Sequence, residues 1–273
     1  MKKDKLLIIN DITGYGRVSS FAMYPILSAY GIHPYFLPTA LVSNTLDYGS
    51  AEILDTSAWM KRTIDKWKEY DFTFSCVSVG LLNSSEQVET IIELIEAQKP
   101  SFVLVDPIMA DNGELYPDMY ENVVECNRRM AGYADLLLPN YTEAVLLTGY
   151  DNDTDQLTDD QYNKLVDALY ELGPKSIIIK GCKDENGRHF NLISKAPGTA
   201  IIKQFFDRTK QDFIGTGDVF SSVLLSELLS GADIETATKC SADFVLTVIH
   251  DNSDNEDHYD LVLEKSLSKL FSK

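Results

Sequence analysis

Short apolar runs alternate with longer amphipathic stretches along the chain. The runs are continuous and partly β-branched, which is typical of strands buried on both faces of a sheet. They lie at residues 6–9, 102–105, 136–138 and 177–179. This alternation predicts a mostly parallel sheet whose strands are connected by helices.

Two of the intervening stretches begin with a helix start signal. Ser84 and Gln87 are three residues apart, as in a capping box, and Thr158 and Gln161 repeat the arrangement. Apolar residues after the first box recur at helical spacing, at Val88, Ile91, Ile92 and Ile95. Gly and Pro at 173–174 end the second helix. We therefore predict an α/β fold of three layers, αβα, with a mostly parallel central sheet.

Two segments depart from this alternation. Residues 33–50 contain two prolines and little helical period, and we expect edge strands or a flap there. Residues 187–206 hold apolar runs without helix signals, which predicts an antiparallel hairpin at the sheet edge. Neither an internal repeat nor a linker-like stretch interrupts the sequence, so we predict a single domain over residues 1–273.

Polar residues follow each of the main apolar runs. They are Asn10 and Asp11, Asp106, Asn140, and Lys180 with Gly181. Any one of them alone could be a helix cap. In an open parallel sheet, however, ligands bind outside the carboxyl ends of the strands, so four such positions together predict a binding site at that edge.

The most informative local segment is Gly215, Thr216, Gly217 and Asp218, which precedes an amphipathic run. Two glycines around a threonine let several backbone N–H groups point at one place, at the start of a helix whose dipole favours an anion. A carboxylate beside them could take a proton from a hydroxyl group while the amides hold developing phosphoryl charge. The alternative interpretation is an ordinary capped helix after a glycine turn.

The charge and composition of the chain limit the classes of partner that it is expected to bind. The chain has 24 basic and 42 acidic residues and a formal charge of −18, which argues against nucleic acid and anionic membranes. A small anion remains compatible, because local N–H groups outweigh distant charge. No apolar run reaches the length of a membrane span or a signal peptide. The four cysteines are scattered, so we expect reduced thiols in a soluble cytoplasmic protein.

Two common nucleotide-binding motifs are absent from the sequence. There is no GxxxxGK[ST] stretch, so we do not expect a P-loop protein. Gly14 and Gly16 follow the first apolar run, but Ser19 stands where a dinucleotide fingerprint needs its third glycine.

These segments, taken in order, resemble the ribokinase-like kinases, and within them the pyridoxal/pyridoxamine (vitamin B6) kinases. The matching stretches are residues 10–25, 80–87 (GLLNSSEQ), 106–113 (DPIMADNG), 139–143 (PNYTE) and 215–218 (GTGD). The last stretch is common to the superfamily, whereas the ordered set is specific to B6-type and closely related kinases. The resemblance extends from about residue 5 to residue 250.

The resemblance implies ATP-dependent phosphorylation of the 5′-hydroxymethyl group of pyridoxal, pyridoxamine or pyridoxine. Asp218 would be the base, and the N–H groups of Gly215, Thr216 and Gly217 would hold the phosphoryl group. ATP would be bound by Asp106, Asn140, Glu143, Lys180 and Gly181, with Mg²⁺ at Asp106 and Glu143 through water. The vitamer would be bound by Asn10, Asp11, Tyr15, Thr45, Leu81 and Asp111. The resemblance also implies a homodimer, and it leaves a monovalent cation open.

The departures from the family pattern lie mainly on the acceptor side. They are Leu81 in place of a tyrosine, Asn10 or Asp11 in place of a serine, Leu46 in place of a threonine, Ala110 in place of a glycine, and Lys180 in place of a threonine. Hydroxymethylpyrimidine or another hydroxymethyl compound therefore remains an alternative acceptor, and a non-catalytic ligand-binding homologue is a second alternative. Residues 207–212 are a candidate mobile lid whose cations would meet ATP phosphates.

Overall fold

The structure is a computed structural model that describes residues 5–45, 48–117, 119–150, 154–209, 211, 213–255 and 261–271. Two compact units make up the chain. Unit 1 consists of Met1–Thr56 and Arg208–Lys273, and unit 2 of Ser57–Asp207. The division into one domain or more stays a prediction, and each unit is described by itself below.

Unit 1 contains three strands whose first member is longer than predicted. The strands are β1 (Leu6–Tyr15), β2 (Pro34–Asn44) and β3 (Ile53–Asp55). β2 pairs in parallel with β1 and antiparallel with β3. We predicted that Asn10 and Asp11 follow the first strand, and this is wrong: the β1–β2 register shifts between Asn10 and Ile12, and the pairing then resumes as far as Tyr15. An irregularity of this kind re-aims side chains without ending a strand.

The expectation for residues 33–50 is only partly correct. They contain β2, which has a partner on each side, so the outer strand of this unit is β3, beyond that range. The departure Leu46 lies outside the described residues.

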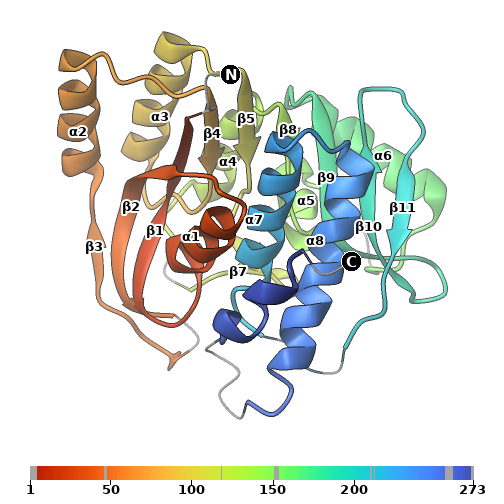
Figure 1. The fold of residues 1–273 in the computed structure, drawn as a ribbon. Helices are drawn as coiled ribbons and strands as arrows, with labels where there is room; N and C mark the ends of the chain where they lie inside the picture. The colour runs from red at the N-terminus through yellow and green to blue at the C-terminus, as the bar shows by residue number, and fades with distance from the viewer. Residues whose placement is uncertain are drawn as a thin grey trace. The chain divides into compact units, whose positions relative to one another are not determined.

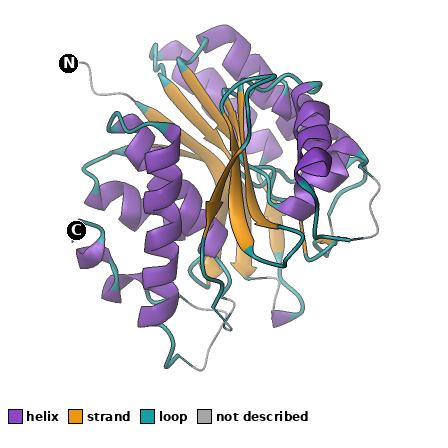
Figure 2. Ribbon diagram, turned by 90° about the vertical axis from the view of Figure 1, so that its right-hand side faces the viewer, coloured by secondary structure: helices purple, strands orange, loops and turns teal. Residues whose placement is uncertain are grey.

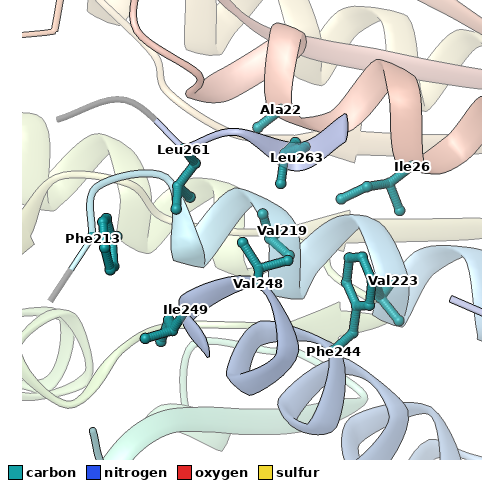
Figure 3. Close-up of a cluster of buried hydrophobic side chains, with 10 residues drawn as sticks. All are labelled: Ala22, Ile26, Phe213, Val219, Val223, Phe244, Val248, Ile249, Leu261 and Leu263. Carbon is teal, nitrogen blue, oxygen red and sulfur yellow. The ribbon is translucent and has the colours of Figure 1, made fainter. Parts of the chain in front are cut away.

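Three helices of unit 1 share an apolar core. They are α1 (Ser19–Ala29), α7 (Thr216–Leu229) and α8 (Ile234–Asp251). Two short 3-10 turns that follow α8, at Leu263–Lys265 and Leu267–Lys269, pack against the same core. Figure 3 shows this core, in which Ile26 of α1, Val219 of α7 and Phe244 of α8 are buried together. The packing brings the start of α7 close to the start of α1, although the two helices are far apart in sequence (Figure 1).

Unit 2 contributes its own strands to the main sheet. Its strands are β4 (Cys76–Val79), β5 (Phe102–Val105), β8 (Leu136–Leu137), β9 (Ser176–Lys183), β10 (His189–Ser194) and β11 (Ile202–Phe205), in the order β11-β10-β9-β8-β5-β4. The pairs from β4 to β9 are parallel. β10 and β11 are the predicted antiparallel hairpin, which lies nearest the viewer in Figure 2. A small separate ribbon joins β6 (Ala110–Asp111) to β7 (Glu114–Leu115).

The prediction that Lys180 and Gly181 follow the strand at residues 177–179 is also wrong. β9 continues to Lys183, because it keeps pairing with β10 after an irregularity opposite Phe190 and Leu192. Gly181 has a φ of +71°, which a glycine adopts without steric cost.

The helices of unit 2 are α2 (Ser57–Glu69), α3 (Ser85–Gln98), α4 (Val123–Ala131), α5 (Tyr141–Thr148) and α6 (Asp159–Tyr170). Of these, α3 and α6 are the two whose starts the sequence predicts. Thr158 and Gln161 form the predicted capping box. Ser84 caps α3 as predicted, but Gln87 accepts the N–H of Asn83 instead of closing the box. Within the described part of the chain, no helix is long and apolar enough to cross a membrane.

Candidate active site

The predicted site residues fall into two clusters, one in each unit. Unit 1 holds Asn10, Asp11, Tyr15, Thr45, Gly215, Thr216, Gly217 and Asp218, and unit 2 holds Leu81, Asp106, Asp111, Asn140, Glu143, Lys180 and Gly181. We call the first the Asp218 cluster and the second the Asp106 cluster.

The glycine-rich segment forms the N-terminus of α7. Gly215 is the residue that precedes the helix, with a φ of +87°, and Thr216 is the first helical residue. A Cβ atom at position 215 would lie 2.4 Å from the carbonyl oxygen of Arg17, so both the backbone conformation and the space require glycine. The first N–H groups of a helix have no partner within it, which makes this turn suited to binding an anion.

Asp218 faces the starts of two helices. It lies in the first turn of α7, and its Oδ2 atom accepts the backbone N–H of Ser19 at 2.8 Å. Ser19 is the first residue of α1 and has a φ of +50°, a left-handed conformation that is uncommon for residues other than glycine. Both helix N-termini favour the ionised carboxylate. The geometry therefore holds a negative charge beside the glycine-rich turn.

Asp11 is linked to Asp218 through Ser19. Burial raises the pKa of Asp11, while hydrogen bonds from Ser19 and Thr13 oppose that rise. Thr13 Oγ1 donates to Asp11 Oδ2 at 2.8 Å, and the Ser20 hydroxyl donates to the Asp11 carbonyl at 2.7 Å. Among the described residues, Asp11 Oδ1 is a buried oxygen with no hydrogen-bond partner. Such an atom is costly to leave unpaired, which favours a ligand group that donates to it.

The other predicted acceptor-side residues of unit 1 lie at the ends of β1 and β2. The Thr45 N–H donates to the Tyr15 carbonyl at 3.0 Å, so these two residues are neighbours. Thr45 Oγ1 is buried without a partner among the described residues, whereas the Tyr15 side chain is 58% exposed and packs edge-on against Tyr48. Asn10 is buried, with its amide 3.8 Å from the Met23 sulfur.

In unit 2, Asp106 forms an ion pair with Lys180. The Lys180 Nζ atom lies 2.8 Å from Asp106 Oδ1 and 3.0 Å from Oδ2, and the side chains are only 15% and 6% exposed. Asp106 follows β5, and its N–H donates to Val79 at the end of β4. Asp106 therefore lies at the carboxyl ends of the neighbouring parallel strands β4 and β5, whereas Lys180 reaches it from within β9.

Glu143 and Asn140 form a second polar network in unit 2. Asn140 caps α5 and forms a capping box with Glu143. The carboxylate of Glu143 accepts the N–H groups of Met109 at 3.1 Å and Asn140 at 2.8 Å, and the Asn140 amide donates to the Ala110 carbonyl at 2.7 Å. Burial raises the pKa of Glu143 to about 8, although Lys180 opposes that rise. The network joins the two predicted segments at 106–113 and 139–143.

Direct coordination of Mg²⁺ by Asp106 and Glu143 does not fit this arrangement. Both oxygens of Asp106 accept from Lys180, and both oxygens of Glu143 accept backbone N–H groups. Mg²⁺ prefers one or two carboxylate ligands together with water. In the described residues, no group of three or more Asp, Glu, His or Cys side chains is placed to hold a metal ion.

Some predicted residues are not part of these networks. Asp111 is exposed, and its carboxylate accepts the N–H of Asn112 in its own loop. The Gly181 N–H donates to the Asn191 side chain at 3.3 Å. Leu81 is half-buried in the loop after β4. In the candidate lid, Lys210 and Asp212 lie outside the described residues, so the lid stays a prediction.

The sequence interpretation missed two residues of the Asp218 cluster. Ser19 was considered only as a failed glycine position, and Thr13 was not singled out. Ser19 lies 199 residues from its partner Asp218, so no local pattern connects them. The signal for Thr13 was its place beside Asp11 in a polar stretch of an otherwise apolar strand.

The chain is similar to known kinases in both sequence and structure. It is 30% identical over 195 residues to the hydroxymethylpyrimidine/phosphomethylpyrimidine kinase of Haemophilus influenzae, with 66% of each chain covered. It is 29% identical over 248 residues to the pyridoxine/pyridoxal/pyridoxamine kinase of Bordetella avium, which covers 86% of this chain and 81% of that one.

A crystal structure from Bacteroides thetaiotaomicron, assigned as a phosphomethylpyrimidine kinase and obtained in an orthorhombic form with pyridoxal, matches with a TM-score of 0.91. The identity is 29%, and the match covers 98% of this chain and 96% of that one. It confirms the predicted mixed α/β fold with a large, mostly parallel sheet, and the relatives confirm the resemblance to B6-type kinases. Residues 26–262 match the model of one family, so the chain belongs to the phosphomethylpyrimidine kinase family.

Proposed function

We propose that the chain is an ATP-dependent kinase that transfers a phosphoryl group to the 5′-hydroxymethyl group of a vitamin B6 vitamer. The observation that carries the proposal is Asp218 itself. Its carboxylate lies in the first turn of α7, accepts the Ser19 N–H at 2.8 Å and adjoins the glycine-rich turn. Phosphoryl transfer needs positioning and charge stabilisation more than covalent chemistry, so these parts suit it.

The Asp218 cluster would act on the acceptor hydroxyl and the transferring group. Asp218 would accept the proton that leaves the hydroxyl as the O–P bond forms. The N–H groups of Gly215, Thr216 and Gly217 would donate to the phosphoryl oxygens, because they lie at the N-terminus of α7 and the helix dipole adds to their effect.

The Asp106 cluster would act on the nucleotide. Lys180 is a cation suited to phosphate oxygens, and it lies beside Asn140 and Gly181. Mg²⁺ enters this proposal as part of the Mg–ATP substrate, where it neutralises phosphate charge, with contacts to Asp106 and Glu143 through water.

The proposal has two candidate acceptors. The Bordetella avium relative supports a B6 vitamer and the Haemophilus influenzae relative supports hydroxymethylpyrimidine, at nearly equal identity. We favour the vitamer because the match to the Bordetella avium kinase covers more of both chains than the match to the Haemophilus influenzae kinase does. Hydroxymethylpyrimidine is the second candidate.

A coupled ADP-release assay with pyridoxal, pyridoxamine, pyridoxine and hydroxymethylpyrimidine tests the assignment. We expect the highest kcat/KM with a vitamer. A higher value with hydroxymethylpyrimidine would make that compound the acceptor, whereas tight vitamer binding without turnover would support a non-catalytic homologue. Repeating the assay in potassium and in sodium buffers tests the requirement for a monovalent cation.

We also propose a homodimer. In unit 1, large apolar side chains of β2 and β3 are exposed, among them Tyr35, Leu41, Ile53 and Leu54. An exposed apolar patch on a sheet edge is typical of an association surface. Light scattering after gel filtration should give twice the 30.6 kDa chain mass. A monomer at micromolar concentration would contradict this.

We propose a cytoplasmic location. The four cysteines are free thiols, and Cys76, Cys126 and Cys182 are buried. Proteins of reducing compartments keep such thiols, which supports the location. Fractionation of cells that produce the protein should recover it with cytosolic markers.

A further inference from the structure

The Asp106 cluster contains its own cation. Lys180 Nζ lies 2.8 Å and 3.0 Å from the two oxygens of Asp106, so the ammonium group spans the carboxylate. A divalent metal ion bound directly to Asp106 would compete with Lys180 for the same oxygens. The two positive charges also repel each other, and this repulsion is weakly screened because the pair is largely buried.

The backbone holds Lys180 in place. Its N–H donates to the Pro139 carbonyl at 2.8 Å, and it forms an isolated parallel bridge with Asn140. Lys180 also lies within β9, between Ile179 and Cys182, which pair with β10. The ammonium is therefore presented by a paired strand, and it does not have the mobility of a surface lysine.

The second acidic group of the cluster does not offer an alternative ligand. Both oxygens of Glu143 accept backbone N–H groups, from Met109 and Asn140. Lys180 and Asp106 both affect the charge state of Glu143, so the three side chains lie within electrostatic range of one another. The Lys180 ammonium thus forms an ion pair with Asp106 and also acts electrostatically on Glu143.

We propose that Lys180 is the resident cation of this cluster and that it keeps divalent metal off Asp106 until a nucleotide brings the metal in. The inference rests on the proposed function only in taking ATP as the carrier of the metal. It assigns Lys180 a role in metal selectivity, because the protein without nucleotide should bind divalent ions poorly.

The test is a titration of the nucleotide-free protein with Mn²⁺, followed by calorimetry and by the loss of the free Mn²⁺ electron paramagnetic resonance signal. Lys180→Met removes the charge and keeps a similar volume. We expect the variant to bind one Mn²⁺ about tenfold or more tightly than the natural protein, because a carboxylate has lost a competing unit charge. The double variant Lys180→Met/Asp106→Asn should lose this gain.

Lys175→Met is the matched control. Lys175 immediately precedes β9 and pairs with Asp135, but its side chain is 79% exposed. The control should bind Mn²⁺ as the natural protein does. If Lys180→Met bound Mn²⁺ no more tightly than this control, the inference would be overturned.

The natural protein alone provides a second measurement, in case Lys180→Met fails to fold. Saturable Mn²⁺ binding by the nucleotide-free natural protein at submillimolar concentration would overturn the inference. Weak binding supports it. No acceptor or turnover enters these measurements, so their outcome is distinct from that of the kinase assay.

Discussion

The Asp218 cluster and the Asp106 cluster surround their central carboxylate in different ways, and Asp218 is half-buried whereas Asp106 is buried. Asp218 accepts a backbone N–H and lies at the starts of α1 and α7, so dipoles of the main chain stabilise its charge. Asp106 is instead spanned by the ammonium of Lys180. The Asp218 carboxylate is held by the main chain beside the glycine-rich turn, whereas the Asp106 carboxylate is part of an ion pair on which the stability of the fold depends.

We therefore expect substitution of Asp218 to reduce mainly activity, and substitution of one partner of the Asp106–Lys180 pair to reduce mainly stability. Replacing a carboxylate by an amide at Asp218 leaves an oxygen that still accepts the Ser19 N–H, so the fold loses little. Removing one partner of a buried ion pair leaves an uncompensated charge, and the fold loses much. Four substitutions test this contrast.

Asp218→Asn should have the largest effect, on activity. We expect kcat to fall by about 10² to 10⁴-fold, since the amide cannot accept the hydroxyl proton. ADP release measures the loss, and ATP binding should be retained. Asp243→Asn, which removes an exposed carboxylate paired with Lys239, is the control and should leave kcat unchanged. Activity of Asp218→Asn close to that of the natural protein would show that Asp218 is not the base.

Lys180→Met should have the largest effect on stability. Breaking a buried pair by removing one partner costs about 3–5 kcal/mol, which for a chain of this size lowers Tm by on the order of 10 °C. Thermal unfolding followed by circular dichroism measures it. Arg129→Met breaks an exposed pair with Glu89 and should leave Tm unchanged. Equal shifts for the two variants would contradict the contrast.

Gly215→Ala should follow in size. A left-handed conformation costs a residue other than glycine about 1–3 kcal/mol, and the new methyl group would also meet the Arg17 carbonyl oxygen at 2.4 Å. Denaturant unfolding measures the loss. Gly217→Ala is the matched control, because its Cβ meets nothing within 4 Å. If both variants unfolded at the same denaturant concentration, the close approach at Gly215 would not matter.

Asp11→Asn should have the smallest effect, visible as a pH dependence. Burial raises the pKa of Asp11 above its usual 3.8, so above that pH the folded state retains a proton that the unfolded chain has released. Asp11 therefore contributes most to stability at a pH below its usual pKa of 3.8, and this contribution falls as the pH rises toward the raised pKa of the folded state.

An asparagine at position 11 does not titrate and still accepts from Thr13. The Tm of Asp11→Asn relative to that of the natural protein should therefore increase as the pH rises above about 4. Calorimetry at several pH values measures the trend. A constant or decreasing difference would mean that Asp11 is as well stabilised in its ionised form as it is in water.

Local patterns predicted the elements better than they predicted the contacts between them. The cap at Thr158 and the hairpin at β10 and β11 depend on residues close in sequence, and both are confirmed. The ends of β1 and β9 were placed too early, because continued pairing with a neighbouring strand outweighs polar residues such as Asn10 and Lys180. Strand pairing is a tertiary effect that composition does not contain.

The candidate site shows the same division. Gly215 to Asp218 are contiguous, so their helix start was predicted from sequence. The pairing of Lys180 with Asp106 joins residues 74 apart, and the sequence indicated only that a cation replaces a threonine of the family. Which carboxylate a lysine meets depends on strand order, and that became known only from the structure.

The hydrogen bond between Ser19 and Asp218 also has a consequence for protein synthesis. Ser19 leaves the ribosome among the first residues, whereas Asp218 follows 199 residues later. At about 5–20 residues per second, the first strands wait roughly 10–40 s for α7. Unit 2 lies between the two halves of unit 1 in the sequence, so its segment is complete before unit 1 has its second half. A nascent chain that stops before α7 therefore lacks Asp218 and exposes the apolar face of α1 that α7 covers, so we expect chaperones to bind it.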